Sequence, residues 1–183
     1  NFIEDEKAGM WVGSSNGIYQ YNEKTDHFDP HLAATDSAKQ NTYYLTSSAE
    51  PGLFWISGRQ TNPPNKGLGL SKYDTRTNTV TEFRNQTNDS SSIASDNTRW
   101  IRSDSLRRLW IATDKGLSLF VPEKNNFINY QLKDKSDGRN IGMVELQTDL
   151  NNNLWLTSQR GLVFFNSLTK SFTLYPAHEK DPH

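Results

Sequence analysis

The apolar positions of this chain follow a pattern that recurs four times. Each copy centres on a tryptophan with a bulky apolar residue on either side, and the intervals between copies are 44, 55 and 45 residues (Trp11, Trp55, Trp110 and Trp155). Because successive side chains of a strand point to opposite faces, each tryptophan lies on one face and its two neighbours lie on the other. The pattern predicts one short strand per copy that is buried on both faces.

A glycine sets the register of the second half of each copy. It stands six residues after the tryptophan in three copies (Gly17, Gly116 and Gly161), and an insertion at 59–66 delays it to Gly69 in the other. An aromatic residue follows the glycine by four positions and an apolar residue by eleven. A further ring follows by fourteen positions: His31, Phe83, Tyr130 and Tyr175. Glycine at the end of a short turn predicts a positive φ there.

Four antiparallel strands per copy account for this spacing. The first strand is predicted at 2–5, 43–47, 100–104 and 144–149, the second carries the tryptophan, the third begins at the glycine, and the fourth holds the last ring pair. Three copies place an aspartate six residues before the tryptophan, where a carboxylate can accept backbone N–H groups of a turn (Asp5, Asp104 and Asp149). The dipeptide Asn16-Gly17 predicts a two-residue hairpin.

Repeats of four short strands at this spacing are typical of a β-propeller, whose blades span about 40–50 residues. We therefore predict an all-β chain of four propeller blades, each of four antiparallel strands. The predicted blades cover about 1–31, 42–84, 98–131 and 142–175, and a polar tail or linker follows at 176–183.

Composition narrows the function classes. The chain has 183 residues, 33% of them apolar, and no apolar run approaches the roughly 20 residues of a membrane-spanning helix, so no membrane insertion is expected. Lys+Arg 20 against Asp+Glu 21 gives no positive field for nucleic acid. No cysteine is present, and the four histidines have no metal-ligand spacing. We predict neither a metal nor a cofactor.

Four segments around the tryptophans carry a family resemblance. Residues 109–117 (LWIATDKGL) resemble the two-component regulator propeller repeat, and so do residues 10–18 and 154–162. The split segment 54–58 with 69–74 is similar to it as well, although this copy has the insertion and lacks the aspartate. The repeats together cover almost the whole chain.

The resemblance implies a periplasmic sensor region of a bacterial signalling protein, with a histidine kinase or diguanylate cyclase as its output. Propellers in such regions usually have about seven blades, and a further β-domain, a membrane helix and the output module follow them. The chain is accordingly predicted to be an open part of a larger propeller. Its partners would be the remaining blades and the downstream sensor domain, and its exposed end faces favour self-association. The ligands of the family are often carbohydrate-derived.

Six residues are predicted to bind a small-molecule or carbohydrate ligand. First strands line the channel of a propeller, and there the third and fourth copies carry one additional tryptophan and three polar side chains: Trp100, Arg102, Glu145 and Gln147. Lys115 and Arg160 belong to the loop face, together with the connections at 29–41, 84–97 and 131–141 and the insertion. Recognition concentrates on loops that a rigid scaffold positions. The repeated tryptophans are predicted to be core.

Three functions remain open from the sequence. The leading prediction is a non-enzymatic input module, in which ligand binding favours one arrangement of the propeller against the following domain. The second is a streptogramin-lyase-like or glycan-cleaving propeller enzyme, which requires a histidine or a carboxylate pair near the channel. The third is a protein-interaction scaffold, whose loop face would be functional and whose channel would be empty.

Overall fold

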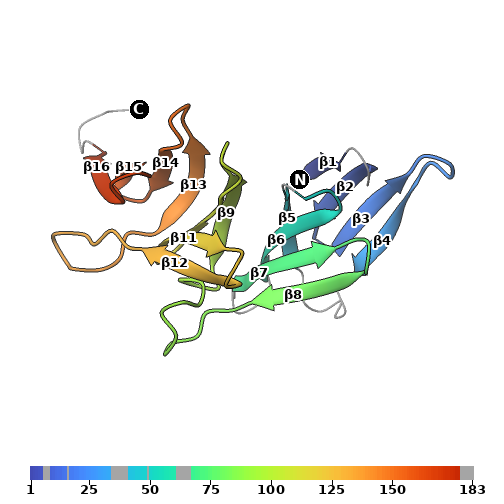
Figure 1. The fold of residues 1–183 in the computed structure, drawn as a ribbon, viewed down its shortest axis with the longest axis horizontal. Coiled ribbons are helices and arrows are strands. Elements are labelled where there is room, and N and C mark those ends of the chain that lie inside the picture. The colour runs from blue at the N-terminus through green and yellow to red at the C-terminus, as the bar shows by residue number, and fades with distance from the viewer. Residues whose placement is uncertain (6–8, 16, 34–40, 49, 61–66, 178–183) are drawn as a thin grey trace. The chain divides into compact units, whose positions relative to one another are not determined.

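The computed structural model describes residues 1–5, 9–15, 17–33, 41–48, 50–60 and 67–177 (Figure 1). These residues form four antiparallel sheets of four strands each, and strands within each sheet are neighbours in chain order. The first two sheets belong to one compact unit, Asn1–Thr87 with Ser95–Thr98, and the last two to another, Asn88–Ala94 with Arg99–His183. The predicted all-β class with four-stranded blades is confirmed. The described part of the chain contains no helix long and apolar enough to cross a membrane.

The strands have the following bounds. The first sheet holds β1 (Phe2–Asp5), β2 (Gly9–Ser14), β3 (Gly17–Asn22) and β4 (His27–Ala33). The second holds β5 (Asn41–Ser47), β6 (Leu53–Gln60), β7 (Gly67–Asp74) and β8 (Thr79–Phe83). The third holds β9 (Thr98–Ser103), β10 (Leu109–Thr113), β11 (Gly116–Val121) and β12 (Asn126–Tyr130). The fourth holds β13 (Met143–Thr148), β14 (Leu154–Ser158), β15 (Gly161–Asn166) and β16 (Ser171–Pro176).

Pairing between the third and fourth strands explains the regular spacing after each glycine. The residues four and eleven positions after it are direct cross-strand partners in all four sheets: Tyr21 with Phe28, Tyr73 with Val80, Phe120 with Phe127, and Phe165 with Phe172. Directly opposed side chains contact one another across an antiparallel pair. The Phe165 and Phe172 ring centroids, for example, lie 4.8 Å apart.

The ring fourteen positions after the glycine contacts the tryptophan of its own sheet in every copy. The centroid distances are 4.5 Å for Trp11 and His31, 5.9 Å for Trp55 and Phe83, 6.1 Å for Trp110 and Tyr130, and 6.0 Å for Trp155 and Tyr175. Three of these rings are Phe or Tyr, and the first is a histidine. One aromatic pair therefore recurs on one face of each sheet.

The glycine itself is required by a close backbone approach. A Cβ on Gly161 would lie 2.2 Å from the Tyr175 carbonyl oxygen, and one on Gly116 would lie 2.4 Å from that of Tyr130. Both glycines have the predicted positive φ, 125° and 130°. Each is the first ladder residue after a two-residue loop, as is Gly17, which pairs with Ser14 and so lies in β3 instead of in the predicted Asn16-Gly17 turn.

The insertion moves the start of the third strand in the second sheet. The sequence predicts that this strand begins at Gly69, but β7 begins at Gly67. The reason is that the inserted residues lengthen the hairpin, so that Arg59 pairs with Gly67 beyond a register shift that follows Ser57. The inserted segment 61–66 lies outside the described residues.

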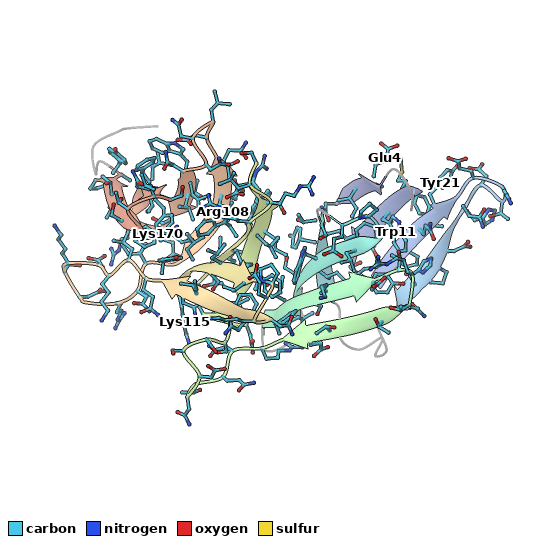
Figure 2. All side chains as sticks on the ribbon, viewed as in Figure 1. Glu4, Trp11, Tyr21, Arg108, Lys115 and Lys170 are labelled. Carbon is cyan, nitrogen blue, oxygen red and sulfur yellow. The ribbon has the colours of Figure 1, made fainter. Side chains whose placement is uncertain are left out.

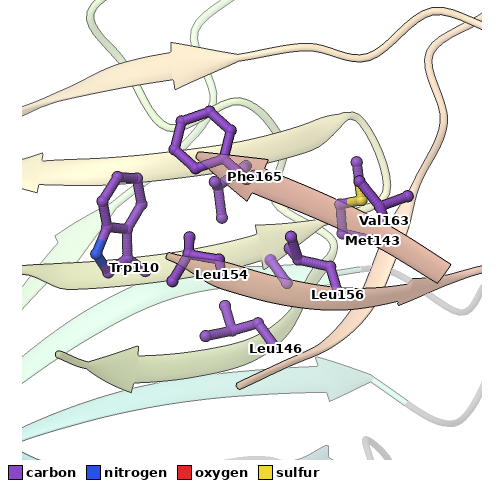
Figure 3. Close-up of a cluster of buried hydrophobic side chains, with 9 residues drawn as sticks. Trp110, Met143, Leu146, Leu154, Leu156, Val163 and Phe165 are labelled. Carbon is purple, nitrogen blue, oxygen red and sulfur yellow. The ribbon is translucent and has the colours of Figure 1, made fainter. Parts of the chain in front are cut away.

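Within each unit, the two sheets pack face to face through a tryptophan. In the second unit Trp110 and Ala112 of β10 join one buried cluster with Leu154 and Leu156, the two neighbours of Trp155 (Figure 3). In the first unit Trp11 joins Phe54 and Ile56, the neighbours of Trp55. The tryptophan face of one sheet thus covers the flanking face of the next. Each fully buried leucine or phenylalanine contributes about 1.5–3 kcal/mol of transfer free energy.

The prediction that every second strand is buried on both faces is only partly right. All five residues of β10 are buried, and so are Leu53 to Gly58 in β6. In β2, however, Met10 is 42% exposed, and in β14 the Trp155 side chain is half-buried. These side chains lie on the faces opposite the two clusters, because Met10 flanks the clustered Trp11 and Trp155 lies between the clustered Leu154 and Leu156.

We predict that Gly161→Ala destabilises the protein by about 2–4 kcal/mol, because the new methyl group meets the Tyr175 carbonyl and the backbone has a positive φ. Gly138→Ala is the control, since Gly138 also has a positive φ, 70°, but nothing lies within 4 Å of its Cβ position. It should cost about 1–2 kcal/mol. Urea unfolding measures both values, and equal losses would contradict the role of the close approach.

Candidate functional site

The four channel candidates lie on edge strands. Trp100 and Arg102 belong to β9, where Trp100 is 38% exposed and Arg102 is half-buried. Glu145 and Gln147 belong to β13, and both are exposed. In the described part of the chain, no side-chain hydrogen bond, ion pair or ring contact joins one of these four residues to another of the four. A ligand site that combines them stays a prediction.

Lys115 and Arg160 occupy the same position in two equivalent hairpins, between the second and third strands of their sheets. In each hairpin a hydroxyl accepts the backbone N–H of this residue: Thr113 for Lys115 at 3.2 Å, and Ser158 for Arg160 at 3.1 Å. Both side chains are exposed, and Lys115 is labelled in Figure 2. The structure gives them different surroundings, because only Arg160 reaches a neighbouring connection.

Arg160 forms two ion pairs with the connection between β12 and β13. Its Nε lies 2.6 Å from Oδ2 of Asp134, and its Nη2 lies 3.6 Å from Oδ2 of Asp137. The connection has internal order of its own: Asp134 accepts hydrogen bonds from the backbone N–H and the hydroxyl of Ser136, and the Gly138 N–H donates to the Asp134 carbonyl. The two carboxylates and Arg160 therefore join the tip of one hairpin to the preceding connection.

A pocket of about 340 Å³ opens between these two segments. Its walls contain two carboxylates, two guanidinium groups and two side-chain amides, with a buried isoleucine beneath: Asp134, Asp137, Arg139, Asn140, Ile141, Gly142, Gln159 and Arg160. The formal charges cancel, while hydrogen-bond donors and acceptors are both abundant. A pocket of this kind suits a neutral, polar molecule that can both donate and accept.

The Asp134 carboxyl of this pocket does not have the electrostatics of the general acid of a glycosidase. Hydrogen bonds from Ser136, followed by the charge of Arg160, lower the pKa of the Asp134 carboxyl below its usual value. Glycoside hydrolysis needs one carboxylic acid that is still protonated near neutral pH, which requires a raised pKa. Asp134 is therefore suited to accept hydrogen bonds and unsuited to donate a proton.

Sequence reasoning identified Arg160 and the 131–141 connection but did not connect them. The missed residues are Asp134 and Asp137, whose carboxylates hold the guanidinium. The segment Asp134-Lys-Ser136 has an aspartate two residues before a serine, which is a recognisable turn signal. The pairing with Arg160 has no local signal, because the partners are more than twenty residues apart in the chain.

Asp104 forms a second polar cluster, and its role is structural. Its buried carboxylate accepts bonds from the backbone N–H groups of Leu106 and Arg108, from the Arg108 side chain at 2.6 Å and from the Trp110 indole at 2.9 Å. Arg108 and Lys170 lie over the Trp110 ring at 5.3 and 5.9 Å. The predicted turn role of the repeated aspartate is confirmed here and at Asp149, while the Asp5 side chain lies outside the described residues.

Comparison with known proteins identifies the architecture. No protein-family model matches the chain. Histidine kinase P4 of Formosa agariphila is 27% identical over an alignment of 219 residues, which covers 91% of this chain and 15% of that protein. The chain therefore spans only a small part of the length of this relative.

Solved structures of similar fold include the extracellular domain of the putative hybrid two-component system BT3049 from B. thetaiotaomicron. It matches with a TM-score of 0.58 and 15% identity, over 94% of this chain and 29% of that one. The chain shares the propeller fold of two-component sensor domains. The predicted resemblance to the two-component regulator propeller is thereby confirmed, and the matched domains are extracellular parts of their own proteins.

Two further structures share this propeller fold. The extracellular domain of the putative one-component system BT4673 from B. thetaiotaomicron matches with a TM-score of 0.62 and 17% identity, over 97% of this chain and 21% of that one. PorZ, a surface component of the type-IX secretion system of Porphyromonas gingivalis, matches with a TM-score of 0.68 and 12% identity, over 98% and 27%. The same fold thus occurs in proteins that are not sensors, so the fold alone does not determine the function.

We predict that Asp104→Asn destabilises the protein by about 2–4 kcal/mol, because it leaves the Arg108 guanidinium without its charged partner beside a buried ring. Asp149→Asn is the matched control at the same repeat position. Its carboxylate accepts bonds only from backbone N–H groups and the Asn153 amide, so its loss should cost about 1 kcal/mol. Thermal unfolding of both variants tests this difference, which vanishes if Asp104 acts only as a turn residue.

Proposed function

We propose that this chain is a non-catalytic ligand-recognition part of an extracytoplasmic sensor region. The observation that carries the proposal is the pocket beside Arg160, in which an ion-paired connection and a hairpin tip enclose polar groups of both kinds. The propeller fold shared with sensor extracellular domains supports the same function. The output module of the longer protein would be a histidine kinase or a diguanylate cyclase.

A polyhydroxylated small molecule, such as a carbohydrate, is the ligand that this pocket fits best. Each hydroxyl group both donates and accepts a hydrogen bond, and the pocket offers carboxylates to accept and guanidinium and amide groups to donate. The volume of about 340 Å³ lies at the lower end of the range for small-molecule sites.

Signal transmission follows from the position of the ion pairs. The Asp134 and Asp137 contacts with Arg160 link the connection that runs from the third sheet to the fourth with a hairpin of the fourth sheet. A ligand that competes for these groups would favour an arrangement of the connection in which the ion pairs are broken, and a ligand that bridges them would favour the paired arrangement. A ligand shifts such an equilibrium only through different affinities for its two states. The remaining sensor domains would read the arrangement that results.

The outer faces of the first and last sheets point to further blades as partners. On the last sheet, Trp155 contacts Phe164 at 4.8 Å, and the neighbouring Leu162 is 41% exposed. On the first sheet, Met10 and Val12 flank Trp11 as Phe54 and Ile56 flank Trp55. Inside each unit a tryptophan face covers a flanking face, so each outer face fits the complementary face of another blade. In the isolated chain a second copy would supply it.

The ligand proposal predicts a difference between two equivalent hairpin residues. Binding to a panel of neutral and acidic mono- and oligosaccharides is measured by calorimetry for the wild-type chain, and then for Arg160→Met and Lys115→Met. For any sugar that binds, Arg160→Met should weaken affinity by at least about tenfold, because it removes a charge-assisted donor from the pocket wall. Lys115→Met should leave affinity unchanged. Equal binding by both variants, or no binding sugar, would contradict the proposal.

The partner proposal predicts concentration-dependent association of the isolated chain. Sedimentation should show a mass that rises with concentration, and Leu162→Lys should reduce the association because it places a charge on the outer face of the last sheet. Leu150→Lys is the control, since Leu150 is fully exposed in a turn. A wild-type chain that remains monomeric at all concentrations would contradict the proposed use of these faces.

A further inference from the structure

His31 occupies a position that carries Phe or Tyr in the other three sheets. It stands fourteen residues after the sheet glycine, as do Phe83, Tyr130 and Tyr175, and its ring packs on Trp11 with centroids 4.5 Å apart. His31 is thus a titratable residue in place of a neutral ring. Among the four copies only the first has this substitution.

The same substitution changes the contact with the next sheet. In the second unit, the Tyr130 ring of the third sheet contacts the Phe165 ring of the fourth at 5.0 Å. In the first unit, the equivalent residues are His31 and Tyr73, and they make a polar contact, with His31 Nδ1 3.2 Å from the Tyr73 hydroxyl. An apolar ring contact between sheets is therefore replaced by a hydrogen bond.

The direction of this hydrogen bond fixes the tautomer of the neutral His31 ring. The Tyr73 hydroxyl donates its one proton to Oδ1 of Asn78 at 2.9 Å, so it accepts from His31 Nδ1–H. The neutral ring then carries its lone pair on Nε2. His31 also lines a pocket of about 260 Å³, so solvent protons can reach the ring.

From this geometry we infer that His31 makes the packing of the first sheet on the second sensitive to protons. In its neutral form the imidazole packs on Trp11 as the tyrosine and phenylalanine rings do in the other sheets. Protonation places a positive charge in this half-buried contact between sheets. The packing contact between the first two sheets is therefore weaker at acidic pH. The equivalent contact of the second unit has only neutral rings at this position.

The groups around His31 also favour weaker packing of the two sheets at acidic pH. Burial lowers the pKa of the His31 imidazole below its usual value, and the Asp29 carboxylate on the same strand opposes this shift only in part. From the second sheet Arg76 lines the pocket, with its charge paired to Asp74 at 2.8 Å and influenced by Glu50. Burial also raises the pKa of Tyr73, which therefore stays neutral across this range.

The sign of the pH dependence follows from linkage. Since the folded pKa is below the unfolded value of about 6.5, unfolding takes up a proton in the acidic range. The stability that His31 contributes is complete above about pH 6.5 and is lost as the pH falls through the folded pKa. A neutral aromatic ring at position 31 would show no such loss.

The test copies the equivalent contact of the second unit into the first. The double variant His31→Tyr with Tyr73→Phe reproduces the Tyr130 and Phe165 pair, and its melting temperature is compared with that of the wild type at pH 7.5 and pH 5.0. Wild type should lose about 2–4 °C more than the double variant on acidification. His27→Gln, which removes the exposed histidine of the same strand, should behave as wild type.

A direct titration keeps the inference testable if the double variant does not fold. NMR of the wild-type chain should show that His31 titrates below pH 6.5, with changes in the Trp11 and Tyr73 signals at the same midpoint. Equal losses of melting temperature in wild type and double variant, or a His31 midpoint at or above 6.5, would overturn the inference.

Discussion

A sheet that is apolar on both faces is stable only when other structure covers each face. Every sheet of this protein is of that kind, because the tryptophan of its second strand lies on one face and two bulky apolar residues lie on the other. Trp110 against Leu154 and Leu156, and Trp11 against Phe54 and Ile56, are two instances of one interface. Since this interface fixes the strand positions, variation is left to the turns and connections, where recognition is usually found.

Within each sheet, the tryptophan contacts one ring from the fourth strand. In the third and fourth sheets the glycine that begins the third strand packs against the carbonyl of the same residue, as Gly69 does against that of Phe83 in the second. These two contacts make the fourteen-residue spacing a structural requirement. The spacing tolerates different rings, however, because only the ring face is needed. At position 31 the ring is an imidazole, which places an ionisable group between two sheets. Tyrosine or phenylalanine at this position would remain neutral.

Arg160 illustrates how equivalent positions acquire different functions. Lys115 occupies the same hairpin position in the preceding sheet and has the same backbone hydrogen bond to a hydroxyl. Only Arg160 meets a connection that carries two aspartates, and this meeting creates a polar pocket. The sheets therefore position the hairpin residue, and the connection supplies the charged groups that it meets. In a longer protein, such as the histidine kinase of which this chain matches a small part, such a pocket would lie on a rigid propeller.

The sequence by itself determined the four repeats, the four strands of each and the glycine turns, because alternating burial and turn chemistry are local properties of the chain. It also determined the turn role of Asp104 and Asp149, whose partners lie within a few residues. The tertiary structure decided which tryptophan face is covered, that Asp134 and Asp137 hold Arg160, and that His31 meets Tyr73, 42 residues away. These contacts depend on how one sheet packs on the next. No local pattern of residues predicts a contact between residues that lie so far apart in the chain.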